Sequence, residues 1–155
     1  MIALLIALSV IGSYITIFMS VALDSLPGFF GAMLLGALPG GIVGAVGHFM
    51  TALVHGFPLG LPTHLLVMAL MFAACYFLGM FYKKNKFLGL FIALMINWPL
   101  SLILSSLMAY AMGVMPTAFG LVEFLFIPLF LGTIMNLIPA AIIYEAIGKR
   151  IHALS

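Results

Sequence analysis

Long apolar runs, interrupted by Pro, Gly and a few charged residues, dominate the chain. Runs of this kind predict membrane-spanning helices, because about 20 apolar residues cross the hydrocarbon core of a bilayer. We predict an all-α integral membrane protein with six spanning helices in one domain over residues 1–155. The approximate bounds of the helices are residues 2–20, 29–38, 40–55, 62–82, 87–112 and 117–148.

The second and third helices are separated because of Pro39, which stands inside an otherwise continuous apolar run. Proline lacks a backbone donor and disfavours helix in the residue before it. A single helix over residues 29–56 would be about 42 Å long, whereas the hydrocarbon core is about 30 Å thick. The pattern therefore predicts a short second helix. Pro99 is expected to kink the fifth helix, and Pro128 and Pro139 the sixth.

The basic residues lie in two clusters, which set the expected orientation. They are Lys83, Lys84 and Lys86 after the fourth helix, and Lys149 and Arg150 after the sixth. Two helices separate the clusters, so both lie on one side of the membrane, and the positive-inside rule makes that side cytoplasmic. With six spans both termini are cytoplasmic, and Asp24 lies in an outer loop.

The composition excludes several classes of protein. Of the 155 residues, 66% are hydrophobic and 5% are charged, whereas about 25% of the residues of a soluble domain are charged. The chain has no GxxxxGK[ST] phosphate loop, so energy for any transport must come from an ion gradient or a partner subunit. No catalytic triad, pair of catalytic carboxylates or HExxH motif can be assembled. We expect neither catalysis nor a nucleic-acid partner, and a lipid bilayer as surroundings.

Polar side chains inside the predicted helices are costly in lipid, so they point to a ligand or to helix pairing. Glu123 lies about five residues inside the sixth helix, while Asn97 and Asn136 lie deeper. A proline follows each asparagine closely and frees a backbone carbonyl. The asparagines therefore either bind a ligand or satisfy those carbonyls. Asp24 either contacts a ligand or is a solvated helix cap.

Three histidines surround the loop between the third and fourth helices, namely His48, His55 and His64. Three histidines could ligate a metal, but none forms an HxxxH pair on one helical face, and we expect no metal site. Hydrogen bonding to a heterocyclic or hydroxylated ligand is favoured, with helix pairing as the alternative. Trp98 and Phe30 could stack on a flat ring.

Small residues recur at every fourth position in the first three predicted helices. The longest series is Gly28, Ala32, Gly36, Gly40 and Gly44. Such stripes let helices approach closely in lipid, where no hydrophobic force drives them together. Most should serve packing within the chain. We expect the pair Ala3 and Ala7, on the first helix, to contact another protein.

Several local strings carry a resemblance to a known family. They are residues 2–15 (IALLIALSVIGSYI), 26–30 (LPGFF), 39–52 (PGGIVGAVGHFMTA) and 56–58 (GFP), followed by His64. With its size and predicted six-helix layout, the whole chain resembles the S components of energy-coupling factor (ECF) vitamin transporters. Ala3 and Ala7 match the AxxxA motif of that family on the first helix.

The resemblance implies a function and a set of partners. S components are multi-pass proteins of the bacterial plasma membrane that bind a vitamin or its precursor from outside. Their pocket is built from helices four to six and the loop between helices one and two. A membrane T component would dock on the first helix, and two cytosolic ATPases that use ATP and Mg²⁺ would drive toppling and release inside. The chain itself would bind no cofactor.

The short length and the segment at residues 48–64 look most similar to S components assigned to alpha-ribazole, a precursor in cobalamin salvage. Its benzimidazole would suit Trp98 or Phe30, and its ribose would suit Asn97, Glu123 or the histidines. Riboflavin, thiamine, pantothenate and a pyridoxine-like compound remain open, while the lack of an N-terminal Met-x-His arm disfavours nickel or cobalt. The expected substrate-binding residues are Asp24, Phe30, His48, His64, Asn97, Trp98, Glu123 and Asn136.

Two other readings compete with this one. The chain could be a proton-coupled carrier in which Glu123 exchanges protons with the substrate, since intramembrane carboxylates form proton relays. It could also be a structural membrane protein that binds no small molecule.

Overall fold

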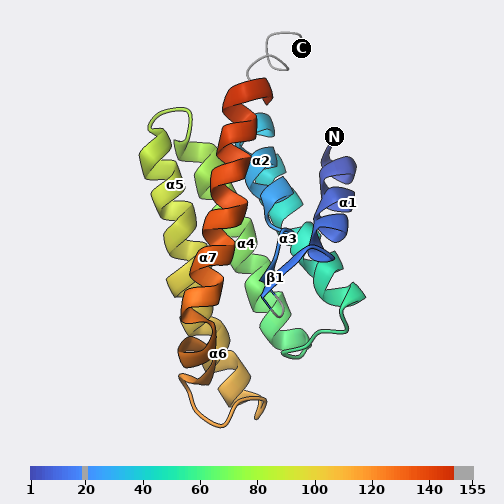
Figure 1. The fold of residues 1–155 in the computed structure, drawn as a ribbon, viewed down its shortest axis with the longest axis vertical. Coiled ribbons are helices and arrows are strands. Elements are labelled where there is room, and N and C mark those ends of the chain that lie inside the picture. The colour runs from blue at the N-terminus through green and yellow to red at the C-terminus, as the bar shows by residue number, and fades with distance from the viewer. Residues whose placement is uncertain (19–20, 149–155) are drawn as a thin grey trace.

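The computed structural model describes residues 1–18 and 21–148, which form an elongated bundle of helices (Figure 1). The helices are α1 (Ile2–Ser13), α2 (Leu26–Leu35), α3 (Ala37–Val54), α4 (Leu61–Phe81), α5 (Lys86–Met95), α6 (Ser101–Ala111) and α7 (Gly120–Ile143). Two π-helical turns, η1 (Ile96–Leu100) and η2 (Tyr144–Gly148), continue α5 and α7. Two short strands, β1 (Thr16–Phe18) and β2 (Val21–Ala22), pair antiparallel between α1 and α2.

Four helical segments are long and apolar enough to cross a membrane. They are Ala37–Val54, Leu61–Phe81, Lys86–Ala111 and Gly120–Ile147, of which the third runs from α5 through η1 to α6. The other two apolar helices, α1 and α2, have 12 and 10 residues, fewer than the roughly 20 that a span needs. An integral membrane protein is thus supported, and six full spans are not established.

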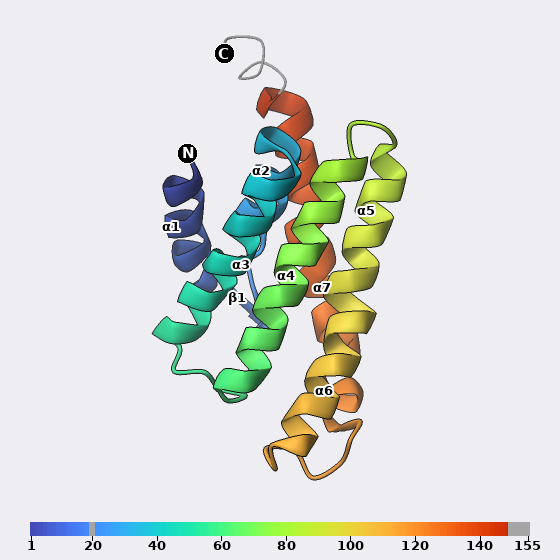
Figure 2. The same cartoon turned by 180° about the vertical axis from the view of Figure 1, so that it is seen from behind.

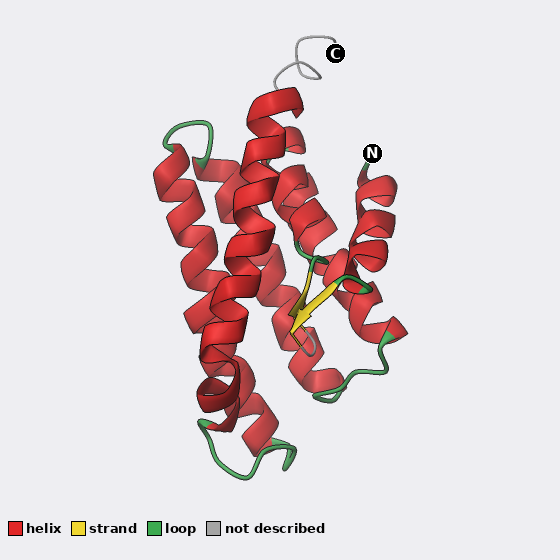
Figure 3. Cartoon of the chain, in the orientation of Figure 1, coloured by secondary structure: helices red, strands yellow, loops and turns green. Residues whose placement is uncertain are grey.

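The prediction of one helix over residues 2–20 is wrong for the described residues after Ser13, and residues 19–20 lie outside the described part. Helix α1 ends at Ser13, and the chain then forms the β1–β2 hairpin. A short apolar run does not distinguish helix from strand, and the β-branched and aromatic residues of Thr16–Phe18 favour extended backbone. The hairpin lies partway along the bundle rather than beyond its end (Figure 3). Asp24 lies in the segment between this hairpin and α2.

The predicted break between the second and third helices is confirmed, but it falls at Gly36 rather than at Pro39. Gly36 has φ of 95°, a left-handed conformation that favours glycine, and it ends α2. Pro39 lies in the first turn of α3, where its missing N–H would have no helical partner. The short second helix therefore begins and ends about three residues before its predicted bounds.

Helices α2, α3 and α4 pack closely through small residues. A Cβ atom on Gly40 would overlap the backbone of Ala32, and one on Gly44 would lie 2.6 Å from the sulfur of Cys75. Phe29, Met33 and the other residues of this contact are buried. We call the contact between Ala32, Gly40, Gly44 and Cys75 the small-residue core. The predicted stripe thus serves packing within the chain, as most such stripes do.

The two ends of the bundle differ in what they contain. The start of α1, the connection between α4 and α5 with its lysines, and the end of the α7–η2 helix lie together at one end, as both views show (Figures 1 and 2). The α3–α4 and α6–α7 connections lie at the other. The lysine cluster therefore lies at the same end of the bundle as the end of η2. The predicted basic tail, Lys149 and Arg150, lies outside the described residues.

Candidate functional site

A cavity of about 140 Å³ lies among α3, α4, α6, α7 and the segment that joins the hairpin to α2. Its apolar lining includes Leu59, Val67, Met71, Leu102, Leu121, Leu125 and Leu129. Its polar lining consists of Asp24, Ser25, His48, His64, Asn97, Ser101, Ser105, Thr133 and Asn136. An apolar body with several convergent polar groups is the usual make-up of a small-molecule site.

The lining residues place the cavity between the hairpin and the lysine-free end of the bundle. Leu59 belongs to the α3–α4 connection and Leu121 to the first turn of α7, both at that end. Ala22, the last residue of β2, lines the cavity near the middle of the bundle. Non-helical backbone at membrane depth is tolerated only where protein buries it or where it lines a cavity, and Ala22, which is buried and lines the cavity, fulfils this condition.

Asn136 fastens the segment after the hairpin to α7. Its side-chain oxygen accepts a hydrogen bond from the Leu26 N–H at 2.8 Å, and its amide nitrogen donates to the Ala22 carbonyl at 2.8 Å and to Gly132. Asn136 is 2% exposed, so water does not reach its side chain, and these protein partners satisfy its polar atoms instead. Asn136 therefore satisfies backbone groups, but these are at Leu26, Ala22 and Gly132, and none is the carbonyl that Pro139 frees, as one of the two predicted alternatives had it.

Asn97 lies in the π-helical turn Ile96–Leu100, which contains Pro99. At this proline, where a kink is expected, the structure has a π-helical turn, a type frequent at functional sites. The Asn97 amide donates a hydrogen bond to the Thr133 hydroxyl at 3.1 Å. This bond links the middle of the α5–α6 helix to α7 beside the cavity.

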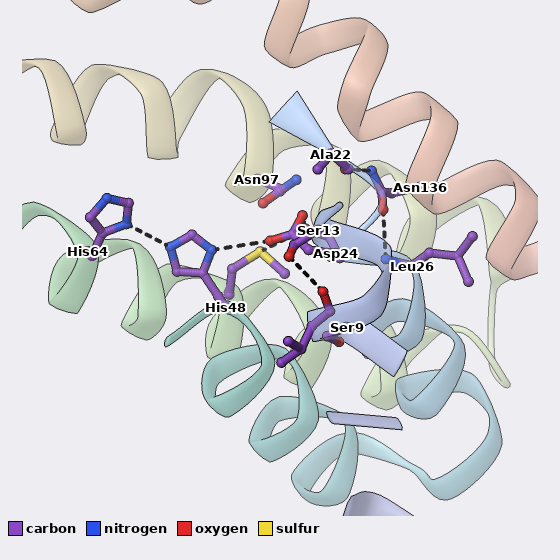
Figure 4. Close-up of polar contacts among 12 residues, drawn as sticks. Ser9, Ser13, Ala22, Asp24, Leu26, His48, His64, Asn97 and Asn136 are labelled. Carbon is purple, nitrogen blue, oxygen red and sulfur yellow. Dashed lines mark hydrogen bonds and ion pairs between the residues drawn. The ribbon is translucent and has the colours of Figure 1, made fainter. Parts of the chain in front are cut away.

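Asp24, His48 and His64 form a row that crosses three elements (Figure 4). The Oδ2 atom of Asp24 lies 3.7 Å from Nδ1 of His48, and Nε2 of His48 lies 3.3 Å from Nδ1 of His64. The two imidazole planes are inclined by 28° with their centroids 5.5 Å apart, so the rings meet edge to edge through these nitrogens, and the Phe57 ring packs on His64. The other nitrogen of His64, Nε2, is buried without a hydrogen-bond partner in the part of the chain that the structure describes.

Five of the eight predicted substrate-binding residues line the cavity, and three lie elsewhere. Trp98 donates from its indole to the Phe126 carbonyl and packs against the rings of Phe126 and Phe130. Phe30 is partly buried against the hydrophobic core. Glu123 is exposed near the α6–α7 connection, where it lines a separate surface hollow. Among the described residues, no Phe, Tyr or Trp lines the cavity.

Sequence reasoning missed the hydroxyl groups of the site. Ser101 and Ser105 are four residues apart on α6 and are both buried against the cavity, as is Thr133 on α7. Buried hydroxyls with helical spacing, on the same predicted helices as Asn97 and Asn136, were a usable signal. A single Ser or Thr is common at helix contacts in membranes, so one such residue does not stand out in the sequence as part of a site.

The remaining histidine of the loop, His55, lies apart from the row and packs on the Tyr14 ring with centroids 5.6 Å apart. Over residues 1–18 and 21–148, no group of three or more His, Cys, Asp and Glu side chains could hold a metal ion. The two alanines predicted for docking, Ala3 and Ala7, are exposed on α1 next to the exposed Leu4 and Leu8.

Fold and site together define a helical, multi-pass membrane protein that encloses a small, partly polar cavity. Residues 1–148 match the family model of the substrate-specific component of ECF transporters, and the chain belongs to this family. It is therefore a substrate-specific transporter subunit of the cell membrane, not a catalytic one. Searches of curated proteins and of solved structures gave no significant match.

Proposed function

We propose that this chain captures a vitamin or vitamin precursor from outside the cell and releases it inside when a T component and two ATPases act on it. The observation that carries the proposal is the cavity, since five polar side chains singled out from the sequence meet in it. Its walls combine donors and acceptors with leucine side chains, which suits a heterocycle bearing hydroxyl or amino groups.

Cavity size bears on the choice of substrate. A volume of about 140 Å³ is close to the roughly 150 Å³ of a cavity that accepts benzene, and below the about 300 Å³ at which drug-sized pockets begin. Alpha-ribazole, the substrate favoured by the sequence resemblance, has a fused ring system and a ribose, so the cavity would have to widen. A pyridoxine-like compound has one hydroxylated ring, and this volume favours it as the second candidate.

The residues that line the cavity also limit which side chains could stack on a flat ring of the substrate. Stacking on Trp98 or Phe30 finds no support, because both side chains lie outside the cavity. The imidazoles of His48 and His64 are the ring systems in its wall. A proton-coupled carrier that uses Glu123 also finds no support, since this residue is exposed and is not among the residues that line the cavity.

A thermal-shift screen of the purified chain in detergent tests the proposal. The compounds are alpha-ribazole, pyridoxine, thiamine, riboflavin and pantothenate, because a ligand that binds only the folded state stabilises it, by about 2.7 kcal/mol at a hundred times Kd. One compound should raise Tm. His64→Ala and Asn97→Ala should lose most of that rise, and His55→Ala should keep it. A screen in which no compound raises Tm contradicts the proposal.

A second experiment tests coupling to the partner subunits. The exposed Ala3 and Ala7 suit a close helix contact, so Ala3→Trp and Ala7→Trp should stop uptake by cells that coexpress the T component and ATPases. Ligand binding by the purified variants should persist. Ala111→Trp, at an exposed position of α6, is the matched control and should transport normally. Unimpaired uptake by both α1 variants would refute docking on this surface.

A further inference from the structure

In the row Asp24, His48 and His64, the carboxylate at one end determines which ring nitrogen of each histidine carries the proton. A carboxylate is an acceptor only, and the hydroxyl of Ser25 already donates to its Oδ1 atom at 3.3 Å. The carboxylate oxygen nearest His48 faces Nδ1 at 3.7 Å, which electrostatically favours a proton on that nitrogen. In a neutral imidazole with its proton on Nδ1, the other nitrogen is an acceptor.

The acceptor nitrogen of His48 then determines the state of His64. It lies 3.3 Å from Nδ1 of His64, and a hydrogen bond between them requires the proton on His64 Nδ1. Neutral His64 consequently carries a lone pair on Nε2. The tautomer of a histidine is commonly set by the partner of its other nitrogen, and here that partner is a second histidine held by a carboxylate.

The Nε2 atom of His64 takes no part in the contacts among Asp24, His48 and His64. It is buried without a partner in the described structure, although His64 lines the cavity. Buried polar atoms are almost always paired, and an orphan in a native protein calls for a specific explanation. The tilted contact with the Phe57 ring and the hydrogen bond to His48 restrict rotation of the His64 ring.

We propose that Asp24 and His48 are positioning residues that hold His64 in the Nδ1–H tautomer, so that its Nε2 accepts a hydrogen bond from the substrate. The inference rests on the proposed binding function and narrows the substrate class. The ligand presents a ring N–H, an amino group or a hydroxyl at this point of the cavity. A carbonyl or carboxylate there would face a lone pair and be rejected.

Nuclear magnetic resonance of ¹⁵N-histidine-labelled protein in detergent at neutral pH tests the tautomer without any ligand. Single His→Gln variants assign the signals. In the wild-type protein, Nε2 of His64 should be unprotonated and Nδ1 protonated. Asp24→Asn and His48→Gln should shift His64 toward a mixture of tautomers, while His55→Gln should leave it unchanged. A proton on Nε2 of His64 in the wild-type protein overturns the proposal.

Binding of two matched probes tests the ligand class. Benzimidazole carries a ring N–H, and 1-methylbenzimidazole lacks it but has nearly the same shape. Benzimidazole should bind at least about tenfold more tightly by thermal shift, and His48→Gln should reduce that ratio, a change that loss of packing alone would not cause. Equal affinities, or no binding of either probe, overturn the ligand class. If every compound of the vitamin screen also fails, the binding function itself is refuted, and the tautomer result still stands by itself.

Discussion

The small-residue core and the cavity share helix α4 but follow opposite rules of packing. On one side of α4, Cys75 and Leu78 are fully buried against α2 and α3, with glycines that admit no added carbon. On another side, His64, Val67 and Met71 line a space bordered by hydroxyl, amide and imidazole groups. Close contact between helices supplies stability in lipid, where burial of apolar surface against another helix gains little. The cavity can remain open because the core holds α4 in place.

The largest effect is expected from filling the small-residue core. Gly40→Leu would force α3 away from Ala32, whose backbone already occupies the space of a Cβ atom. Overpacking of this kind should lower the free energy of unfolding by about 3 kcal/mol and abolish ligand binding as well. Thermal unfolding in detergent measures the loss. Ala111→Leu, at an exposed site on α6, should change stability little, and a similar Tm for both variants would contradict the comparison.

A smaller loss of stability is expected at Asn136, which holds the backbone of the segment between the hairpin and α2 against α7. Asn136→Ala leaves the partly buried Leu26 N–H and the buried Ala22 carbonyl without partners and should cost on the order of 2 kcal/mol. The matched control is Asn85→Ala, which removes a helix cap that accepts from the Leu88 N–H at an exposed site, and should cost about 1 kcal/mol. Chemical unfolding should rank the two in this order, and the reverse order would show that Asn136 does not fasten the segment.

A pair of threonines sharpens the comparison within the cavity region. Thr133 accepts a hydrogen bond from Asn97, so Thr133→Val should cost about 1 to 2 kcal/mol and reduce the ligand-induced rise in Tm. Thr63 is equally buried, but its hydroxyl has no partner in the described structure and does not line the cavity. Thr63→Val should be neutral or stabilising. Equal losses in the two variants would show that the Asn97–Thr133 bond contributes nothing.

The smallest effect is expected at Trp98. Its indole bonds to the Phe126 carbonyl and its ring packs on Phe126 and Phe130, away from the cavity lining. Trp98→Phe should cost about 0.5 to 1 kcal/mol of stability and leave the Kd of the substrate unchanged. Isothermal titration of the purified variant checks this. A Kd raised tenfold would return Trp98 to the binding site.

Much of the fold was predictable, and the failures have physical causes. Runs with helical length reproduced α3, α4, the α5–α6 helix and α7 to within a few residues. The hairpin after Ser13 was missed because an apolar strand of three residues leaves no periodic signal inside an apolar run. The break near Pro39 was expected, but Gly36 produces it, since proline is acceptable in a first helical turn and a left-handed residue ends a helix.

The candidate site was predictable in its chemistry more than in its geometry. The cost of polar groups in lipid selected Asn97 and Asn136, the gathering of histidines around one loop selected His48 and His64, and Asp24 was selected as a loop carboxylate. The same rule of lipid cost also selected Glu123, which does not line the cavity, because depth along a helix does not tell which side of the helix faces the cavity. Trp98 and Phe30 were chosen as ring partners by residue type alone, and their neighbours on adjacent helices place them elsewhere.

The sequence by itself determined that this protein resides in a membrane, where its basic residues lie, and which few polar groups had to find partners, because lipid tolerates neither charge nor unpaired backbone groups. Only the tertiary structure decided that Asn136 binds the backbone of a distant hairpin and that Asp24 meets His48 and His64 beside a cavity. These contacts join residues that are far apart in the chain. Their formation depends on how closely the glycines allow the helices to approach.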